Sequence, residues 1–355
     1  MRTAPLTAVL LLATASAGSA AGQALPALEH VRRIGCLDCR GPELFGEIAD
    51  LALTPNGTVY VLTMPPPIVR GFDANGKVIL ATGRQGRGPG EYAAPSFLSP
   101  LSDTTFQVID VITRRVMRLD AKGNETAFTA MPNFPIAAHR SPGSNFTIAA
   151  ITDFRSPTLT VQRWRDGAQT PETVLKFGPE FPRRSETEPS TFISFAVNAR
   201  GEFAVGDGNF EYRIAVYDST GRKLREITRD IPLPMRSQAE MQYEEDRRKR
   251  NADQLRAKRG AERGGGPGGQ PPISPTKAHF QSLAFVYDDE GRLWVLTRRG
   301  SLTSTVFDVF SPAGQYLGEV KVPERLLQFD IRGRVLAAVS ADENDVQGIS
   351  LYRMR

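Results

Sequence analysis

Short stretches of alternating hydrophobic and polar residues, separated by turn residues, make up most of the chain after residue 46. The clearest stretch, Asp50–Glu91, holds four such runs: Leu51–Leu53, Thr58–Thr63, Ile68–Asp73 and Lys77–Thr82. Asn-Gly pairs between β-rich runs favour tight hairpins, because both central residues must tolerate positive φ. The stretch therefore predicts four antiparallel strands, which is the unit of a propeller blade.

Two landmarks of this unit recur along the chain. The turn between the third and fourth strands recurs at Asp73–Gly76, Asp120–Gly123, Asp166-Gly167, Asp218–Gly221 and Ser311–Gly314. The loop after the fourth strand recurs at Gly41–Glu43, Gly88–Tyr92 and Gly178–Phe181, with spacings of 47 and 90 residues. A period of about 40–50 residues with four strands each is typical of a propeller.

The landmarks divide the chain into six units. Five of them cover residues 46–92, 93–132, 133–182, 190–232 and 280–322. The sixth has only three C-terminal strands, Leu326–Asp330, Val335–Ser340 and Gly348–Arg353, so Leu28–Ile34 should supply its fourth strand. We therefore expect an all-β, six-bladed propeller over residues 25–355, whose last blade the N-terminal strand completes and whose edges are thereby covered.

Residues 235–278 do not fit the repeat. A capping box, Ser237 with Glu240, predicts the start of a helix, and acidic residues lie four positions before basic ones. The helix has few apolar residues, which predicts a solvated helix, and the following Gly264–Gly269 and Pro271-Pro272 predict a disordered segment. Two interpretations stay open: a mobile basic lid or docking arm for an acidic partner, or a tolerated surface insertion.

The first 24 residues have the pattern of a secretory signal peptide. Arg2 precedes the apolar run Leu6–Ala13, and small residues offer cleavage points between residues 17 and 24. No later stretch is long and apolar enough to span a membrane. We therefore expect an exported protein, periplasmic or extracellular.

The formal charge is mild, +5 over 355 residues, and residues 235–278 alone carry ten Lys and Arg against six Asp and Glu. The sequence therefore does not predict a nucleic-acid-binding surface.

In a propeller, the loops after the second and fourth strands of every blade lie on one face. Ligands generally bind at a channel mouth, so this face is the candidate functional surface. The candidate residues on it are Arg84, Arg87, Glu91, Asp110, Asp153, Asp207, His279, Arg298, Arg299 and Asp342.

Four of these residues, Asp110, Asp153, Asp207 and Asp342, could form a ring of carboxylates around the channel. Such a ring could hold Ca²⁺, which prefers several oxygen ligands. Alternatively, each Asp caps its own turn by accepting local backbone hydrogen bonds, and we favour this second interpretation.

The remaining candidate chemistry is limited. Cys36 and Cys39 are the two cysteines, and we expect a local disulfide, with a redox dithiol as the alternative. The histidines are His30, His139 and His279; His139 and His279 are expected on opposite faces, which argues against a three-histidine metal site. The sequence thus predicts no bound metal or cofactor, apart from the possible Ca²⁺.

Particular residues resemble a known family. Gly83–Tyr92 with Pro95, and Val108–Gly123, resemble NHL-type repeats, and Gly291–Val295 with Phe307–Gly318 look like exported bacterial six-bladed propeller proteins. The resemblance implies the fold. Its members include peptide-processing lyases with a histidine-rich metal centre, lactonases with calcium held by Glu, Asn and Asp, and pure interaction modules; neither ligand set maps onto this chain.

We therefore expect an exported propeller that acts as a binding or protein-interaction scaffold through one channel-mouth face. The expected partner is an envelope protein, a peptide or a glycan. The alternative is a calcium-dependent hydrolase or lyase of the lactonase kind. Fold alone does not decide between them.

Overall fold

The computed structural model describes residues 25–35, 41–131, 133–140, 143–152, 158–168, 170–178, 193–206, 210–259, 272–342 and 344–355. The expected signal peptide, Cys36, Cys39, Asp153, Asp207 and the Gly-rich segment 264–269 lie outside these residues.

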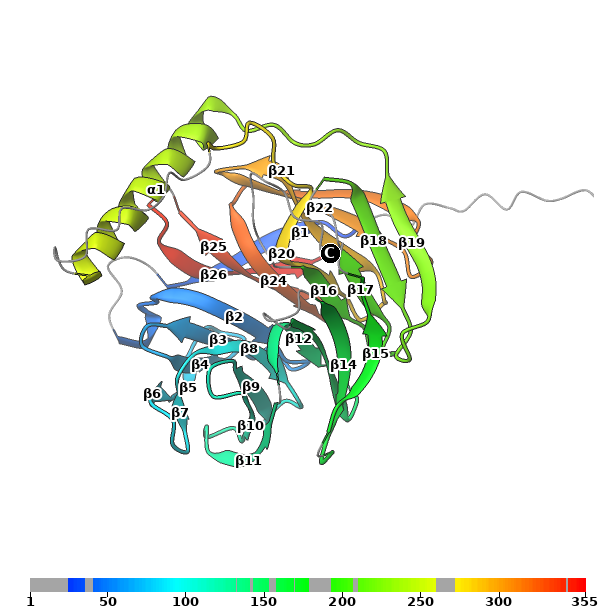
Figure 1. Cartoon of the computed structure of the whole chain (residues 1–355). Coiled ribbons are helices and arrows are strands. Elements are labelled where there is room, and N and C mark those ends of the chain that lie inside the picture. The colour runs from blue at the N-terminus through cyan, green and yellow to red at the C-terminus, as the bar shows by residue number, and fades with distance from the viewer. Residues whose placement is uncertain are drawn as a thin grey trace, which may run out of the picture.

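Six four-stranded antiparallel sheets form a ring (Figure 1). The first two blades are β2 (Glu47–Leu53), β3 (Val59–Met64), β4 (Ile68–Phe72) and β5 (Val78–Thr82), and then β8 (Pro95–Pro100), β9 (Phe106–Asp110), β10 (Arg115–Leu119) and β11 (Glu125–Ala130). The third and fourth blades are β12 (Phe134–Arg140), β13 (Phe146–Thr152), β14 (Leu159–Arg165) and β15 (Glu172–Lys176), and then β16 (Ser194–Val197), β17 (Phe203–Gly206), β18 (Tyr212–Tyr217) and β19 (Lys223–Arg229). The last two blades are β20 (Phe280–Tyr287), β21 (Leu293–Ser301), β22 (Ser304–Phe310) and β23 (Tyr316–Val322), and then β24 (Leu326–Arg332), β25 (Val335–Ala341), β26 (Gln347–Met354) and β1 (Leu28–Ile34). The predicted six-bladed fold is confirmed.

The first strand of each blade lies innermost. Strands β2, β8, β12, β16, β20 and β24 contact one another around the ring and line the central channel. A chain that enters each blade at the channel and leaves it at the rim places all its inner strands parallel to one another. The six channel-lining strands therefore start at one mouth and end at the other.

The predicted closure by the N-terminal strand is confirmed. β1 pairs antiparallel with β26 over its length, from Leu28 opposite Met354 to Ile34 opposite Ile349. The last blade thus combines both ends of the described chain, and this pairing covers an edge of β26 that would otherwise be open.

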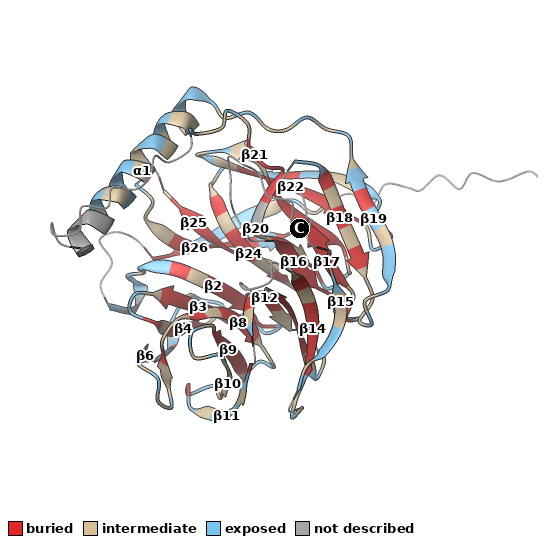
Figure 2. Cartoon of the chain, in the orientation of Figure 1, coloured by how far each residue is buried: buried red, intermediate tan, exposed pale blue. Residues whose placement is uncertain are grey.

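The core lies between adjacent blades, where the strands are buried on both faces (Figure 2). Its largest cluster joins the last three blades through aromatic residues such as Trp294, Phe307 and Phe329. Phe307 contacts Trp294 and Phe329 edge-on, with ring centroids 5.9 Å and 4.9 Å away. Because the inner strands are buried on both faces, their residues are mostly apolar in continuous runs.

The recurring hairpin turn has one chemistry. At the first example, the Asp73 side chain accepts hydrogen bonds from the N–H groups of Asn75 (2.9 Å) and Lys77 (2.8 Å). Gly76 closes the turn with a φ of 75°, which a residue with a Cβ rarely adopts. Asp120 and Asp218 accept the same pair of bonds in their turns, which explains the period seen in the sequence.

The insert leaves the ring after β19 and contains the helix α1 (Gln238–Arg259). The predicted capping box is confirmed: Ser237 N–H donates to Glu240 over 2.8 Å, and Glu240 N–H donates to the Ser237 hydroxyl over 3.2 Å. Along the helix, Glu244 pairs with Arg247 and Asp246 with Lys249, both at i,i+3 spacing. Backbone bonds between residues 234–236 and 275–277 tie the two ends of the insert together.

Candidate functional site

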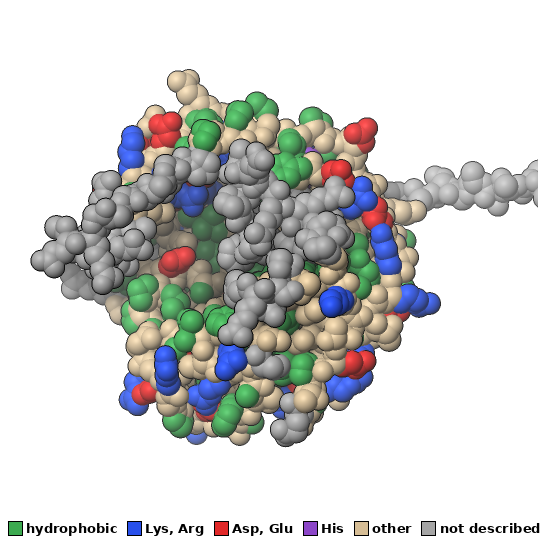
Figure 3. Space-filling view, viewed as in Figure 1, with side chains coloured by type: hydrophobic (Ala, Val, Ile, Leu, Met, Phe, Trp, Pro, Cys, Tyr) green, Lys and Arg blue, Asp and Glu red, His purple; other side chains and the backbone are tan. Residues whose placement is uncertain are grey.

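The insert lies at the mouth of the channel where the inner strands start. It ends at Ala278, just before His279 and β20, so α1 lies on the predicted candidate face beside the last two blades (Figure 1). Lys and Arg side chains are spread over the described part of the visible face and mix with Asp and Glu (Figure 3).

The loop from Arg84 to Glu91 is held by its own residues. Arg84 and Gln85 (β6) pair in parallel with Glu91 and Tyr92 (β7). The Glu91 carboxylate accepts the N–H groups of Gly88 (2.8 Å) and Arg87 (3.0 Å) and pairs with Arg84 at 2.9 Å. The Gly88 bond, and then Arg84, lower the pKa of Glu91, so this predicted residue closes a loop.

The two described members of the predicted aspartate ring cap their own turns. Asp110 is fully buried and accepts four backbone N–H groups, those of Ala93, Ala94, Ile112 and Thr113. Asp342 accepts the N–H groups of Asn344 and Val346, both at 2.9 Å. In the described part of the chain, no three or more His, Cys, Asp or Glu residues are placed to hold a metal ion.

Arg298 and Arg299 were predicted in a loop, and this prediction is wrong, because β21 extends to Ser301 and contains both. Arg299 pairs with Glu319 and with Asp308, which is fully buried and also pairs with Arg229 at 2.8 Å. The fold brings His279 to this cluster, with its ring 5.4 Å from that of Tyr212. Burial, and then Arg299, lower the pKa of His279.

Polar side chains anchor α1 to the ring. The Tyr243 hydroxyl bonds to Asp345, and Arg325 joins both, at 2.8 Å from the hydroxyl and 3.0 Å from the carboxylate. Arg250 pairs with Asp345 at 2.9 Å, further along the helix. Burial opposes ionisation of Asp345, but the bonds from Tyr243 and Arg325 outweigh it and hold its pKa below the usual value.

A second anchor lies at the start of the helix. The Lys277 ammonium pairs with Glu240 at 2.7 Å and donates to the Gly300 carbonyl at 3.0 Å. Both side chains are largely buried, which strengthens the pair relative to a surface one.

Between α1 and the last two blades lies a groove of about 130 Å³. Its helix wall is formed by Glu240, Tyr243 and Glu244, and its ring wall includes Arg298, Thr305 and Arg325. Ser301, Leu302 and Ser304, from the turn between β21 and β22, form its floor with Leu326 and Leu327. The groove is mixed in charge and combines backbone, hydroxyl and apolar surface.

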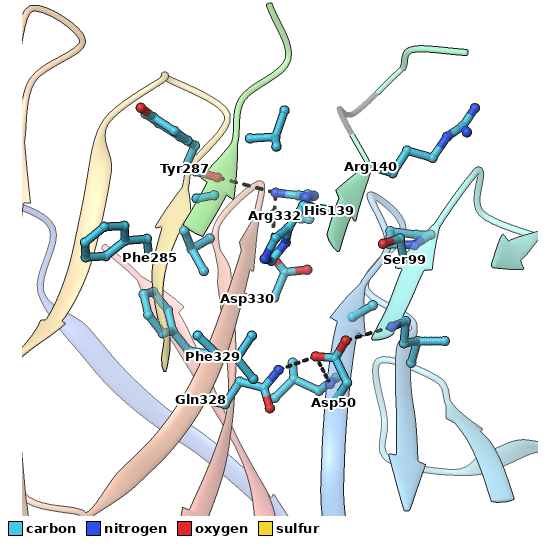
Figure 4. A pocket seen from close by; sticks show the side chains of 18 residues that line it. Asp50, Ser99, His139, Arg140, Phe285, Tyr287, Gln328, Phe329, Asp330 and Arg332 are labelled. Carbon is cyan, nitrogen blue, oxygen red and sulfur yellow. Dashed lines mark hydrogen bonds and ion pairs between the residues drawn. The ribbon is translucent and has the colours of Figure 1, made fainter. Parts of the chain in front are cut away.

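A second cavity, of about 60 Å³, lies inside the channel, and sequence reasoning missed it (Figure 4). It is lined by residues from the C-terminal part of all six inner strands. Because these strands start at the mouth that carries α1, the cavity lies towards the opposite mouth. Its polar residues are Asp50, Ser99, His139, Arg140, Gln328, Asp330 and Arg332. One sequence feature pointed to it: an Asp within an otherwise apolar inner strand is costly to bury unless it has a hydrogen-bonding or charged partner.

Comparisons with known proteins support the fold. The chain matches no protein-family model and no curated protein sequence, whereas 523 chains of known structure match it.

Two of these structures come from Bacteroides. A Bacteroides fragilis protein predicted to be exported is 11% identical, with 93% of this chain and 96% of that one covered, at a TM-score of 0.51. A DUF4221-family member from Bacteroides vulgatus is also 11% identical, with 93% and 98% covered and a TM-score of 0.51. Virginiamycin B lyase from Staphylococcus aureus is 12% identical, with 87% and 85% covered and a TM-score of 0.45. At these identities the similarity to the two Bacteroides structures shows the fold alone.

None of the described helices combines the length and the apolar character that a membrane span requires.

Proposed function

We propose that this protein is an exported binding protein that captures an acidic segment of another protein at the mouth that carries α1. The observation that carries the proposal is the position of α1: its residues from Glu240 to Arg250 anchor it to the ring beside a groove, and residues 247–259 are strongly basic. The N-terminal sequence and the similarity to a Bacteroides protein predicted to be exported support the location.

Charge is segregated along α1. Residues 247–259 contain seven Lys and Arg and a single Asp, a formal charge of +6 in thirteen residues, whereas the acidic residues lie mainly before Arg247. A basic stretch at a fixed position attracts an acidic chain and orients it before contact.

The anchors give this stretch its fixed position. None of the α1 residues whose burial is described, 238–253, is fully buried, so hydrophobic packing contributes little to holding this part of the helix against the ring. Instead Tyr243, Arg250 and Glu240 bond to residues of the last blade and of the insert's base. The groove beside these anchors offers backbone and hydroxyl groups to a bound segment, and the basic half of α1 extends from it.

The alternative, a calcium-dependent hydrolase, finds less support. Asp110 accepts backbone N–H groups with both carboxylate oxygens and Asp342 with one, which leaves fewer oxygens for a calcium ion. A rise in melting temperature on adding calcium chloride, reversed by a chelator, would favour this alternative.

Neutralising the basic half of α1 tests the proposal, with poly-L-glutamate as the probe. The triple variant Arg247→Gln, Arg248→Gln and Lys249→Gln should bind the probe at least fivefold more weakly at about 0.1 M salt, since each exposed pair contributes about 0.2–1 kcal/mol. Raising the salt to about 0.5 M should remove most of the difference by screening.

A charge-matched control removes three exposed basic residues from the turns of the opposite face, Lys77→Gln, Lys122→Gln and Arg165→Gln. The control should bind poly-L-glutamate within twofold of the unchanged chain. Equal losses in the two triple variants would show that only net charge matters, and the proposal would be wrong.

A further inference from the structure

We propose that the cavity inside the channel binds a small primary ammonium compound, with Asp50 as the carboxylate that receives it. The proposal concerns the mouth opposite α1 and is independent of the binding of an acidic partner. It rests on the hydrogen bonds and charges of the cavity wall.

The Asp50 side chain is fixed at the wall by three donors. Oδ1 accepts the N–H of Leu51 at 2.9 Å and the side-chain amide of Gln328, and Oδ2 accepts the N–H of Leu98 at 2.7 Å. These donors come from β2, β8 and β24, so the carboxyl joins three neighbouring blades. Figure 4 shows it at the cavity, facing Gln328.

The other charges around the cavity are already balanced. Arg332 pairs with Asp330 at 3.5 Å, and Asp330 also accepts the N–H groups of Leu53 and Ile331, both at 2.8 Å. Arg140 forms two bonds of 2.9 Å to Asp166 and points away from the cavity (Figure 4). Among the described residues, Asp50 is thus the cavity carboxyl that has no ion-pair partner.

His139 supplies a second, independent polar group at the cavity wall. Its Nε2 atom is buried at the cavity wall and has no hydrogen-bond partner within the described residues. Burial, and then Arg332, lower the pKa of His139 to about 4, so the imidazole is neutral at neutral pH. A neutral imidazole nitrogen can accept a hydrogen bond.

The chemistry of these groups selects the ligand. A primary ammonium carries one positive charge and three N–H donors, which match one unpaired carboxyl and a neutral imidazole. The cavity holds several waters at most, given about 10–15 Å³ for each, so the ligand must be small or end in a narrow stem. A free amine and the end of a lysine side chain share this chemistry.

Proton linkage follows from the burial of Asp50. Burial raises its pKa to about 7, against the lowering effect of its three hydrogen bonds and with a smaller raising effect of Asp330. Ammonium binding requires the ionised form, while His139 stays neutral; the other charged groups of the cavity wall are Arg332, Asp330 and Arg140. The ionised fraction of Asp50 rises about tenfold from pH 6 to pH 8, so the affinity should rise by about the same factor.

The test measures binding of methylammonium to the purified full chain by calorimetry between pH 6 and pH 8. We expect saturable binding that strengthens about tenfold over this range and releases protons near pH 7. Tetramethylammonium, which has no N–H donor, should not bind. Equal binding of tetramethylammonium, tighter binding of calcium, or affinity independent of pH would each overturn the proposal.

Two variants locate the site. Asp50→Asn should weaken methylammonium binding at least tenfold. Asp110→Asn, which changes an equally buried carboxyl outside the cavity, should bind within twofold of the unchanged chain. Loss in both variants, with both folded, would contradict the assignment, and the pH profile of the unchanged chain decides the matter if either fails to fold. An Nα-acetyl-lysine amide, whose side-chain ammonium is free, would identify the source as a lysine side chain if it bound more tightly than methylammonium.

Discussion

At the scale of single residues, aspartates that look alike in the sequence have different environments. Asp110 accepts four backbone N–H groups in full burial, Asp342 accepts two at a partly exposed turn, and Asp50 joins three blades at the channel. All three stabilise the backbone nearby, and Asp50 alone lines the channel cavity. The number of N–H donors and the degree of burial therefore determine how much each carboxyl contributes to the free energy of unfolding.

Replacing Asp110 by Ala should lower the free energy of unfolding by about 3 kcal/mol or more, because several partly buried N–H groups lose their acceptor. The matched change Asp342→Ala should cost about 1 kcal/mol, since fewer groups are affected and water reaches them. Urea unfolding with and without a chelator measures both. A cost at Asp110 that disappears in the chelator would mean that a metal, and not the turn, uses this carboxylate.

At the scale of elements, the sequence predicted the strands, the turns and the insert well and missed the channel cavity. The strands follow from local patterns: Asp73, Asn75 and Gly76 close their turn among themselves. The channel cavity depends on Asp50 meeting Gln328, and these residues are 278 positions apart. A contact between residues so far apart leaves no local sequence pattern from which it could be predicted. Arg299 was misplaced for a related reason, because its partner Asp308 lies on the next strand and holds β21 together beyond its apolar run.

The anchoring of α1 is a prediction at this scale. Tyr243→Phe removes the hydroxyl that joins Asp345 and Arg325, a loss of about 1 kcal/mol, so amides of α1 should exchange with deuterium about fivefold faster. The global free energy of unfolding should change by less than about 0.5 kcal/mol. Tyr316→Phe, on β23, should leave exchange in α1 unchanged. Accelerated exchange spread over all six blades would show that Tyr243 supports the ring and not the helix.

The same anchor should respond to acid. The hydrogen bonds that lower the pKa of Asp345 contribute stability above the pKa of an unfolded aspartate, and this contribution is lost as the pH falls through the lower folded value. The protection factors of α1 amides, which correct for the slower intrinsic exchange in acid, should therefore fall more in acid than those of β25 amides.

At the scale of the whole molecule, the ring depends on pairing between residues at opposite ends of the chain. Ile34 of β1 packs with Val339, Ile349 and Leu351 of the last blade. These contacts and the β1–β26 bonds join the N-terminal segment to the C-terminal strands. The arrangement of residues around each channel mouth therefore depends on the pairing of β1 with β26.

Ile34→Ala should lower the free energy of unfolding by about 2–4 kcal/mol, because it opens a cavity in a buried cluster. Val31→Ala on the same strand, where the side chain is 47% exposed, should cost less than about 0.5 kcal/mol. Thermal or urea unfolding compares them. Equal small effects would mean that the ring is stable without packing of β1.

The most direct test of the proposed function is hydrogen–deuterium exchange of the full chain with and without saturating poly-L-glutamate. We predict slower exchange in α1 and in the turn between β21 and β22, which together line the groove. Protection confined to the turns of the opposite face around Lys122 and Arg165, or no protection at all, would contradict the assignment of α1 and its groove as the binding surface.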